Sequence, residues 1–241
     1  MENFENMIVF DIETTGIDPI NNKIIEIGAL KIKDGEISDV FHELIDPEID
    51  IPYFITNITG ITNKMVENKS KIKEVLERFI DFCDSEYIMG HNILFDYKFI
   101  KINASKYNMK FEKQGYDTLP MARKLLKHLP SKKLTALCEH YNIIHERAHR
   151  ADDDAKVTYE LFLKLKEEFY TENVEVFVSK QMVYKIPKKS NITLKQEKYL
   201  KDLISIHSVD IDKDISSLTK SEASRLIDNI IRKYGYVKRS V

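Results

Sequence analysis

The sequence has only two cysteines and no long run of apolar residues. Cys83 and Cys138 lie far apart and form no C-x-x-C pair, so neither a zinc site nor a dithiol redox site is predicted. We expect two reduced, partly buried thiols instead. No window approaches the roughly 18 apolar residues that a membrane span needs, and the first residues lack the basic and apolar regions of a signal peptide. The predicted location is therefore the cytoplasm.

Repeats and low-complexity segments are also missing, and a hydrophobic content of 43% is enough for a buried core. The charge is divided unevenly along the chain. Residues 173–241 carry 14 basic and 8 acidic side chains, a net +6, whereas residues 1–172 carry 23 basic and 31 acidic ones, a net −8. Nucleic-acid-binding proteins usually have a basic surface. An acidic domain fits such a role if its carboxylates bind cations, since each Mg²⁺ brings a charge of +2.

The spacing of apolar residues predicts one α/β domain over residues 1–172. Short buried strands are predicted at 6–12, an apolar run, and at 87–90, and two more strands at 24–33, which alternates, and at 37–45. Asp34-Gly35 is a strong hairpin signal between the strands at 24–33 and 37–45. Helical periodicity indicates helices at 72–80, 93–107, 118–127, 133–141 and 151–169. Strands followed by strand–helix alternation predict helices packed around a single sheet.

The remaining residues predict a linker and a small helical module. The periodicity is lost over 173–192, which is typical of a linker. Capping-box sequences then start two helices within 193–241, at Thr193 and at Thr219, and Gly235 stops the second helix. Two interpretations stay open for this basic module. It docks nucleic acid or a partner protein, or it is a helical pair packed on the large domain.

Acidic side chains follow the first predicted strand. Asp11 and Glu13 are two residues apart, so both project from the same face of that strand. Two buried like charges are costly unless a cation lies between them, and carboxylate oxygens suit Mg²⁺ or Mn²⁺. A surface hairpin explains the same pair without a cation. The turn at Thr14-Thr15-Gly16 could direct its N–H groups at a phosphate or a terminal hydroxyl.

Two further segments carry acids at the start of helices. Asp96 lies in the first turn of a helix that follows Gly90-His91-Asn92. Asp154 lies near the start of another helix, with His149 just before it. A structural interpretation exists for each, because Asn92 is a suitable helix cap and acids in a first turn favour the helix dipole. Taken singly, neither segment establishes a site.

Together, the three segments resemble the DEDD-type exonucleases that carry a motif histidine, the family of the epsilon proofreading subunit of bacterial DNA polymerase III. The resemblance covers roughly residues 5–170 and includes a D-x-E pair, a G-H-N-x-x-F-D segment and an H-x-A-x-x-D segment. The last spacing selects Asp154 among three consecutive aspartates. Smaller matches lie at 58–61, 117–119 and 133–138. Asp117 is expected to be structural.

The resemblance implies a ribonuclease-H-like fold with a mixed five-stranded sheet, and a site for two divalent cations, Mg²⁺ or Mn²⁺. Asp11 would bridge the cations, Glu13 and Asp154 would hold the one beside the attacking water, and Asp96 would act through bound waters. His149 would take the proton of that water, as a histidine can near neutral pH. The implied product is a nucleoside 5′-monophosphate.

The sequence also contains candidate substrate contacts. Phe95, Ile58 and Ile61 could wedge or stack the terminal base, although a place in the core explains each of them as well. The histidines outside the motif, His128, His140 and His145, are expected to be solvated. The full set of expected substrate contacts is Thr14, Thr15, Gly16, Ile58, Ile61, Asn92 and Phe95.

Three functions remain from the sequence. The first is a DNA exonuclease acting on single-stranded 3′ ends, in proofreading or repair, with a DNA polymerase or another replication protein as its partner. The second is an RNA exonuclease with the same chemistry, because recognition of the 2′-hydroxyl depends on pocket geometry. The third is a catalytically silent nucleic-acid-binding module, against which the intact set of acids argues.

Overall fold

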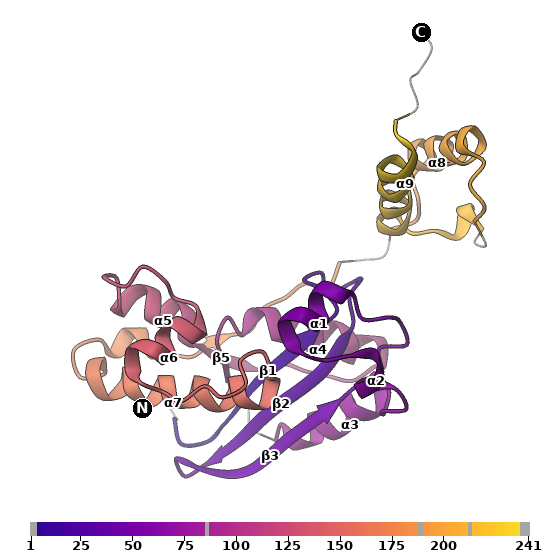
Figure 1. Cartoon of the computed structure of the whole chain (residues 1–241). Helices are drawn as coiled ribbons and strands as arrows, with labels where there is room; N and C mark the ends of the chain where they lie inside the picture. The colour runs from indigo at the N-terminus through magenta and orange to yellow at the C-terminus, as the bar shows by residue number, and fades with distance from the viewer. Residues whose placement is uncertain (1–3, 85–86, 188–189, 212–213, 237–241) are drawn as a thin grey trace. The chain divides into compact units, whose positions relative to one another are not determined.

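The computed structural model describes residues 4–84, 87–187, 190–211 and 214–236. The chain divides into two compact units, Met1–Tyr184 and Lys185–Val241 (Figure 1). No helix within the described ranges is long and apolar enough to cross a membrane. Both cysteines are buried and free, as the sequence predicts.

A mixed sheet forms the centre of the first unit. Its strands are β1 (Met7–Thr14), β2 (Ile24–Lys33), β3 (Glu36–Leu44), β4 (Tyr87–Gly90), β5 (Gln114–Asp117) and β6 (Lys180–Gln181), in the order β3-β2-β1-β4-β5-β6. The first three strands pair antiparallel, β4 and β5 are parallel to β1, and β6 is antiparallel. The turn between β2 and β3 is at Asp34-Gly35, where both residues have positive φ. The expected five strands are present, and the two-residue β6 extends the sheet.

Helices cover both faces of this sheet (Figure 1). The strand alternation directs Met7 and Val9 of β1 to one face, and Ile8 and Phe10 to the other. The first face is covered by α5 (Thr118–Leu125), α6 (Leu134–Tyr141) and α7 (Ala151–Phe169). The second face is covered by α3 (Ile72–Phe82) and α4 (Leu94–Lys106). Two short helices, α1 (Tyr53–Thr59) and α2 (Asn63–Val66), cover a smaller apolar cluster around Ile25.

The first unit extends to Tyr184, beyond the domain end expected at residue 172. A short 3-10 turn (Val174–Val176) follows α7. Phe177 comes next and is buried against the rings of Phe162 and Tyr170. Met182 lies over Gly115 of β5 in the opposite core. These two side chains hold the segment 174–184 against the edge of the sheet. Part of the segment expected to be a linker therefore belongs to the domain.

The second unit has its own small core. Its helices are α8 (Leu194–His207) and α9 (Lys220–Tyr234), with a 3-10 turn (Ile215–Ser217) between them. Both predicted capping boxes are present, with Thr193 paired to Gln196 and Thr219 paired to Glu222. Leucine and isoleucine side chains of both helices, together with Leu218 from the segment between them, form the core, namely Leu200, Leu203, Leu218, Ile227 and Ile230.

The N-terminal end of α7 lies directly against Gly28 of β2. A Cβ atom at Gly28 would lie 2.1 Å from the backbone N of Asp152 and 2.2 Å from the backbone C of Ala151. Because both are backbone atoms, no side-chain rotation can make room. Only glycine at this position allows the helix to approach the strand so closely.

We therefore expect Gly28→Ala to lower the free energy of unfolding by about 2–3 kcal/mol or more, through overpacking. Urea unfolding followed by circular dichroism measures the change. Gly35→Asn is the matched control, because nothing lies near that position and Asn tolerates its positive φ. A Gly28→Ala variant as stable as the wild type would contradict this close contact.

Candidate active site

The five residues selected from the sequence converge at one end of the sheet. Asp11 and Glu13 project from β1 toward α7, and the register of β1 against β2 shifts just after Glu13. Asp96 lies in the first turn of α4, and Asp154 lies in the first turn of α7. All four acids and His149 line a single pocket of about 650 Å³. Residues separated by more than 140 positions thus meet at one site.

Burial and mutual repulsion dominate the electrostatics of this pocket. Burial raises the pKa of Asp11 well above its ordinary value, and the neighbouring Asp96 and Asp154 raise it further. Burial and Asp154 raise the pKa of Glu13 to about 9. The pKa of Asp96 is also raised, chiefly by burial, although its Oδ1 accepts the backbone N–H of Ile12 at 3.1 Å. Such a pocket is stabilised by positive charge.

The donor atoms present fit a hard divalent cation. One ligand atom each of Glu13, His149 and Asp154 lie within 4.8 Å of one another. Carboxylate oxygens are the ligands that Mg²⁺ and Mn²⁺ prefer, whereas an imidazole nitrogen suits softer transition metals. Burial and the neighbouring acids raise the pKa of Asp11 and of Glu13, and a bound divalent cation would offset this repulsion.

The structure separates the three consecutive aspartates. Asp154 alone among them lines the pocket. Asp153 accepts the backbone N–H of Arg147 at 2.9 Å and so closes the turn before α7. Asp152 accepts from the Arg147 guanidinium at 2.7 Å on the outer side. His149 lies in this turn with a φ of +65° and an exposed side chain. The choice of Asp154 from the motif spacing agrees with this placement.

Glu26, which the sequence reasoning missed, holds the start of α7 beside the pocket. It pairs with Glu13 across β1 and β2, and its side chain is fully buried. It accepts hydrogen bonds from the Arg150 guanidinium (2.6 Å), from His42 (2.7 Å) and from the backbone N–H of Ala151 (3.0 Å). Burial alone would raise the pKa of Glu26, but these hydrogen bonds lower it to about 2. The sequence signal that could have identified Glu26 is that it is the only charged residue in the apolar segment 24–30.

His145 was expected to be solvated, and this expectation is wrong. Its side chain is only 8% exposed, and its Nε2 lies 2.7 Å from Oδ1 of Asp154. The sequence showed no motif around it, because its burial depends on how the loop before α7 folds back on the helix. His128 and His140 are exposed, as expected.

The expected substrate contacts divide into two groups. Asn92 and Phe95 line the pocket with the acids, whereas Thr14, Thr15, Gly16, Ile58 and Ile61 do not line it. Ile61 is fully buried in the cluster around Ile25, so the core explanation holds for it, and Ile58 is 52% exposed. Asp117 accepts the backbone N–H groups of Asn92 and Leu119, which is the structural role expected for it.

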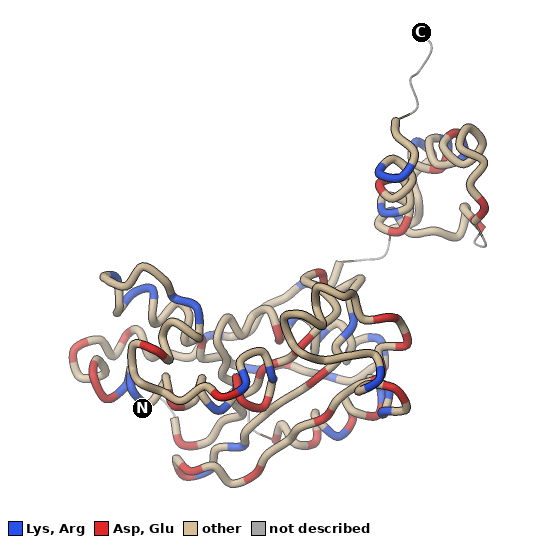
Figure 2. Tube along the Cα trace, viewed as in Figure 1, with Lys and Arg blue, Asp and Glu red and all other residues tan. Residues whose placement is uncertain are grey.

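Basic side chains line one side of the acidic pocket. Arg123, Lys132 and Lys133 line the same pocket. They belong to α5 and the loop after it, where Figure 2 shows Lys and Arg without Asp or Glu. His91 ties this loop to the site, since its ring contacts Thr118 Oγ1 and the Lys132 carbonyl, both at 2.9 Å. Burial lowers the pKa of His91 to about 4, so it is neutral at pH 7.

The sheet, its flanking helices and the acidic pocket define a ribonuclease-H-like nuclease. The sequence model of the exonuclease family RNase_T matches residues 8–162, a range that contains all five pocket residues. The chain belongs to this family, and its four acids and histidine make it a DEDDh exonuclease.

Curated relatives are much longer than this chain. The DNA polymerase III PolC-type of Clostridium perfringens is 41% identical over 218 residues, which cover 86% of this chain and 15% of the relative. The 3'-5' exonuclease DinG of Bacillus subtilis is 38% identical over 167 residues, covering 68% of this chain and 18% of the relative. The chain thus spans less than a fifth of either protein.

Solved structures share the fold. The nuclease domain of 3'hExo, a DEDDh family member bound to rAMP, has a TM-score of 0.60 at 20% identity, covering 77% of this chain and all of that one. E. coli exonuclease I in complex with single-stranded DNA has a TM-score of 0.64 at 19% identity, covering 71% of this chain and 42% of that one. At this identity, the likeness establishes the architecture.

Because Asp11 is buried among other acids, we predict that Asp11→Asn stabilises the metal-free protein. Because the folded pKa of Asp11 lies above its unfolded value, ionising it costs stability, and this cost grows as the pH rises above the unfolded pKa. In EDTA at pH 8, we expect a higher Tm for the variant, by roughly 2–4 °C for each kcal/mol relieved, and a smaller difference at pH 5. Thermal unfolding at both pH values measures it. A lower Tm for Asp11→Asn at both would contradict the repulsion.

Proposed function

We propose that this chain is a two-metal-ion 3′→5′ exonuclease that releases nucleoside 5′-monophosphates from single-stranded DNA ends, in proofreading or repair in the cytoplasm. The observation that carries the proposal is the convergence of Asp11, Glu13, Asp96, Asp154 and His149 in one pocket. The relatives named DNA polymerase III favour DNA, and the relative DinG is named a 3'-5' exonuclease.

The four acids are proposed to hold two divalent cations, Mg²⁺ or Mn²⁺. When bound, such cations supply the positive charge that activates water and neutralises the leaving 3′-oxygen. Asp11, at the centre of the group, would serve both positions. Glu13 and Asp154 would serve the position on the water side, beside His149. Asp96, whose Oδ1 already accepts the Ile12 N–H, would contribute through bound waters.

His149 is proposed as the general base. Its side chain is exposed in the turn before α7, yet one of its ring nitrogens lies within 4.8 Å of ligand atoms of Glu13 and Asp154. Imidazole accepts a proton near neutral pH, so His149 can take one from the attacking water. The turn that carries it is fixed by the Asp153 carboxylate, which holds the Arg147 N–H.

The nucleic-acid strand would run along the basic side of the pocket. Arg123, Lys132 and Lys133 lie within reach of backbone phosphates, and Phe95 could stack against a base. None of these contacts distinguishes deoxyribose from ribose. RNA is therefore the second candidate substrate, and a DNA polymerase or another replication protein is the proposed partner for proofreading.

Removing the bridging acid or the base tests the chemistry. We expect Asp11→Ala and His149→Ala to reduce Mg²⁺-dependent release of mononucleotides from a 3′-labelled DNA strand by at least about 100-fold. His140→Ala, an exposed histidine outside the pocket, is the matched control and should keep full activity. Full activity in either pocket variant, with an unchanged circular dichroism spectrum, would refute the proposal.

Matched DNA and RNA oligonucleotides test the substrate. With Mg²⁺ and Mn²⁺ compared in parallel, we expect faster shortening of the DNA strand, one nucleotide at a time. Equal or faster degradation of the RNA strand would shift the assignment to an RNA exonuclease of the same family.

The C-terminal unit is proposed to dock nucleic acid or a partner protein. Its helices form a separate core, while several of the chain's basic residues lie in the flanking segments 185–189 and 238–239. Because the first unit reaches Tyr184, a chain that ends there should keep its fold and Tm. We expect this truncation to weaken binding to single-stranded DNA, measured by fluorescence anisotropy. Unchanged affinity and a lower Tm would instead favour a structural role.

A further inference from the structure

His145 makes a direct contact with one of the four acids. Its Nε2 lies 2.7 Å from Oδ1 of Asp154, and the two side chains are 8% and 9% exposed. Asp153 is farther away, with its Oδ2 at 3.8 Å from the same nitrogen. A carboxylate oxygen can only accept a hydrogen bond, so Nε2 is the donor. The contact therefore occupies one of the two oxygens of Asp154.

The loop that carries His145 is held at both ends. Asn142 ends α6 in a left-handed conformation, and the Ile143 N–H is donated to the Cys138 carbonyl at 2.9 Å. At the other end, the Arg147 N–H is donated to Asp153. The backbone between these two anchors has little freedom, so the imidazole position is set by the fold.

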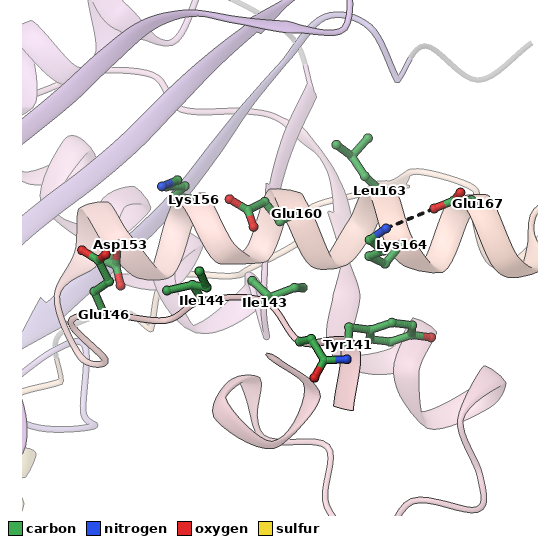
Figure 3. Close-up of a pocket in the computed structure, with 11 residues that line it drawn as sticks. Tyr141, Ile143, Ile144, Glu146, Asp153, Lys156, Glu160, Leu163, Lys164 and Glu167 are labelled. Atoms are coloured by element: carbon green, nitrogen blue, oxygen red, sulfur yellow. Dashed lines mark hydrogen bonds and ion pairs between the residues drawn. The ribbon is translucent and has the colours of Figure 1, made fainter. Parts of the chain in front are cut away.

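The residues on either side of His145 face another way. Figure 3 shows Ile144 and Glu146 beside α7, where they line a hollow of about 510 Å³ with Lys156 and Glu160. His145 does not line that hollow and instead lines the acidic pocket. The loop thus directs His145 away from Ile144 and Glu146 and places its side chain against Asp154.

The surroundings of Nδ1 favour the His145 tautomer that carries its proton on Nε2. Nδ1 of His145 is buried and has no hydrogen-bond partner among the described residues. A buried N–H without a partner is costly, so the proton belongs on Nε2, where Asp154 accepts it. This arrangement gives Asp154 a fixed donor on Oδ1.

We propose that His145 restricts Asp154 to binding a cation through one oxygen, and thereby makes the site favour Mg²⁺ or Mn²⁺ over Ca²⁺. This rests on the metal binding proposed above. Mg²⁺ requires octahedral geometry, in which a carboxylate contributes a single oxygen, whereas Ca²⁺ takes six to eight oxygens and often both from one carboxylate. The hydrogen bond from His145 uses one lone pair of Oδ1 and fixes the carboxylate plane, which disfavours the two-oxygen mode. His145 is a positioning residue, because it acts through Asp154.

The test measures cation binding directly. Mn²⁺ affinity is measured by electron paramagnetic resonance, without nucleic acid, and Ca²⁺ affinity by competition against the bound Mn²⁺. In His145→Ala we expect Mn²⁺ affinity to fall about tenfold, the size typical for loss of a hydrogen bond to a metal ligand. Ca²⁺ affinity should fall less or rise, so the preference for Mn²⁺ shrinks. His145→Gln places an amide N–H near the position of Nε2 and should restore most of the preference.

The controls separate this inference from the proposed function. His140→Ala should match the wild type in both affinities. Wild-type protein that binds no Mn²⁺ would overturn the proposed function and this inference with it. Wild-type binding together with an unchanged Mn²⁺-to-Ca²⁺ ratio in His145→Ala would overturn this inference alone. If His145→Ala fails to fold, His145→Asn, whose amide is too short to reach Asp154, replaces it, and an unchanged ratio there is equally decisive.

Discussion

A single buried carboxylate joins the sheet to the helix that completes the site. Glu26 extends from β2 and accepts hydrogen bonds from the Arg150 side chain and the Ala151 N–H, at the first turn of α7. Gly28, two residues along the same face, leaves room for the helix backbone. His149 and Asp154 lie on either side of this contact, so their positions relative to the acids of β1 depend on it. A buried ion pair of this kind stabilises a fold only when its hydrogen bonds are satisfied, and here they are.

Neighbouring carboxyl groups at this site have opposite electrostatic environments. Glu13 and Glu26 pair across adjacent strands, yet burial and like charges raise the pKa of Glu13 to about 9, whereas hydrogen bonds from His42 and Arg150 lower that of Glu26 to about 2. The difference arises from the partners that the fold provides. Glu26 is already neutralised by protein groups, which leaves the other acids as the ones that need a countercharge from outside.

The local features of the sequence predicted the first four strands and the main helices, whereas the short strands β5 and β6 were not located. The convergence of the four acids was expected from the resemblance to the exonuclease family. The two-residue period of β1 placed Asp11 and Glu13 on one face, and the motif spacing selected Asp154 within its run. The errors concern features that depend on packing between distant segments. His145 is buried because its loop folds back on α7, and the domain continues past residue 172 because Phe177 and Met182 find space in cores built much earlier in the chain. No local sequence pattern predicts the burial of His145 or the packing of Phe177 and Met182.

The short connection between the two units affects how long a nucleic-acid strand stays bound. Only residues 185–190 separate Tyr184 from Asn191, which already pairs with Thr219 of the second unit. A strand that the second unit holds, as proposed above, therefore stays tethered to the nuclease through this short connection. A tether of this length produces an effective concentration in the millimolar range. A strand that leaves the pocket while the second unit still holds it would return before it could diffuse away, which lengthens each encounter without any change in the pocket itself.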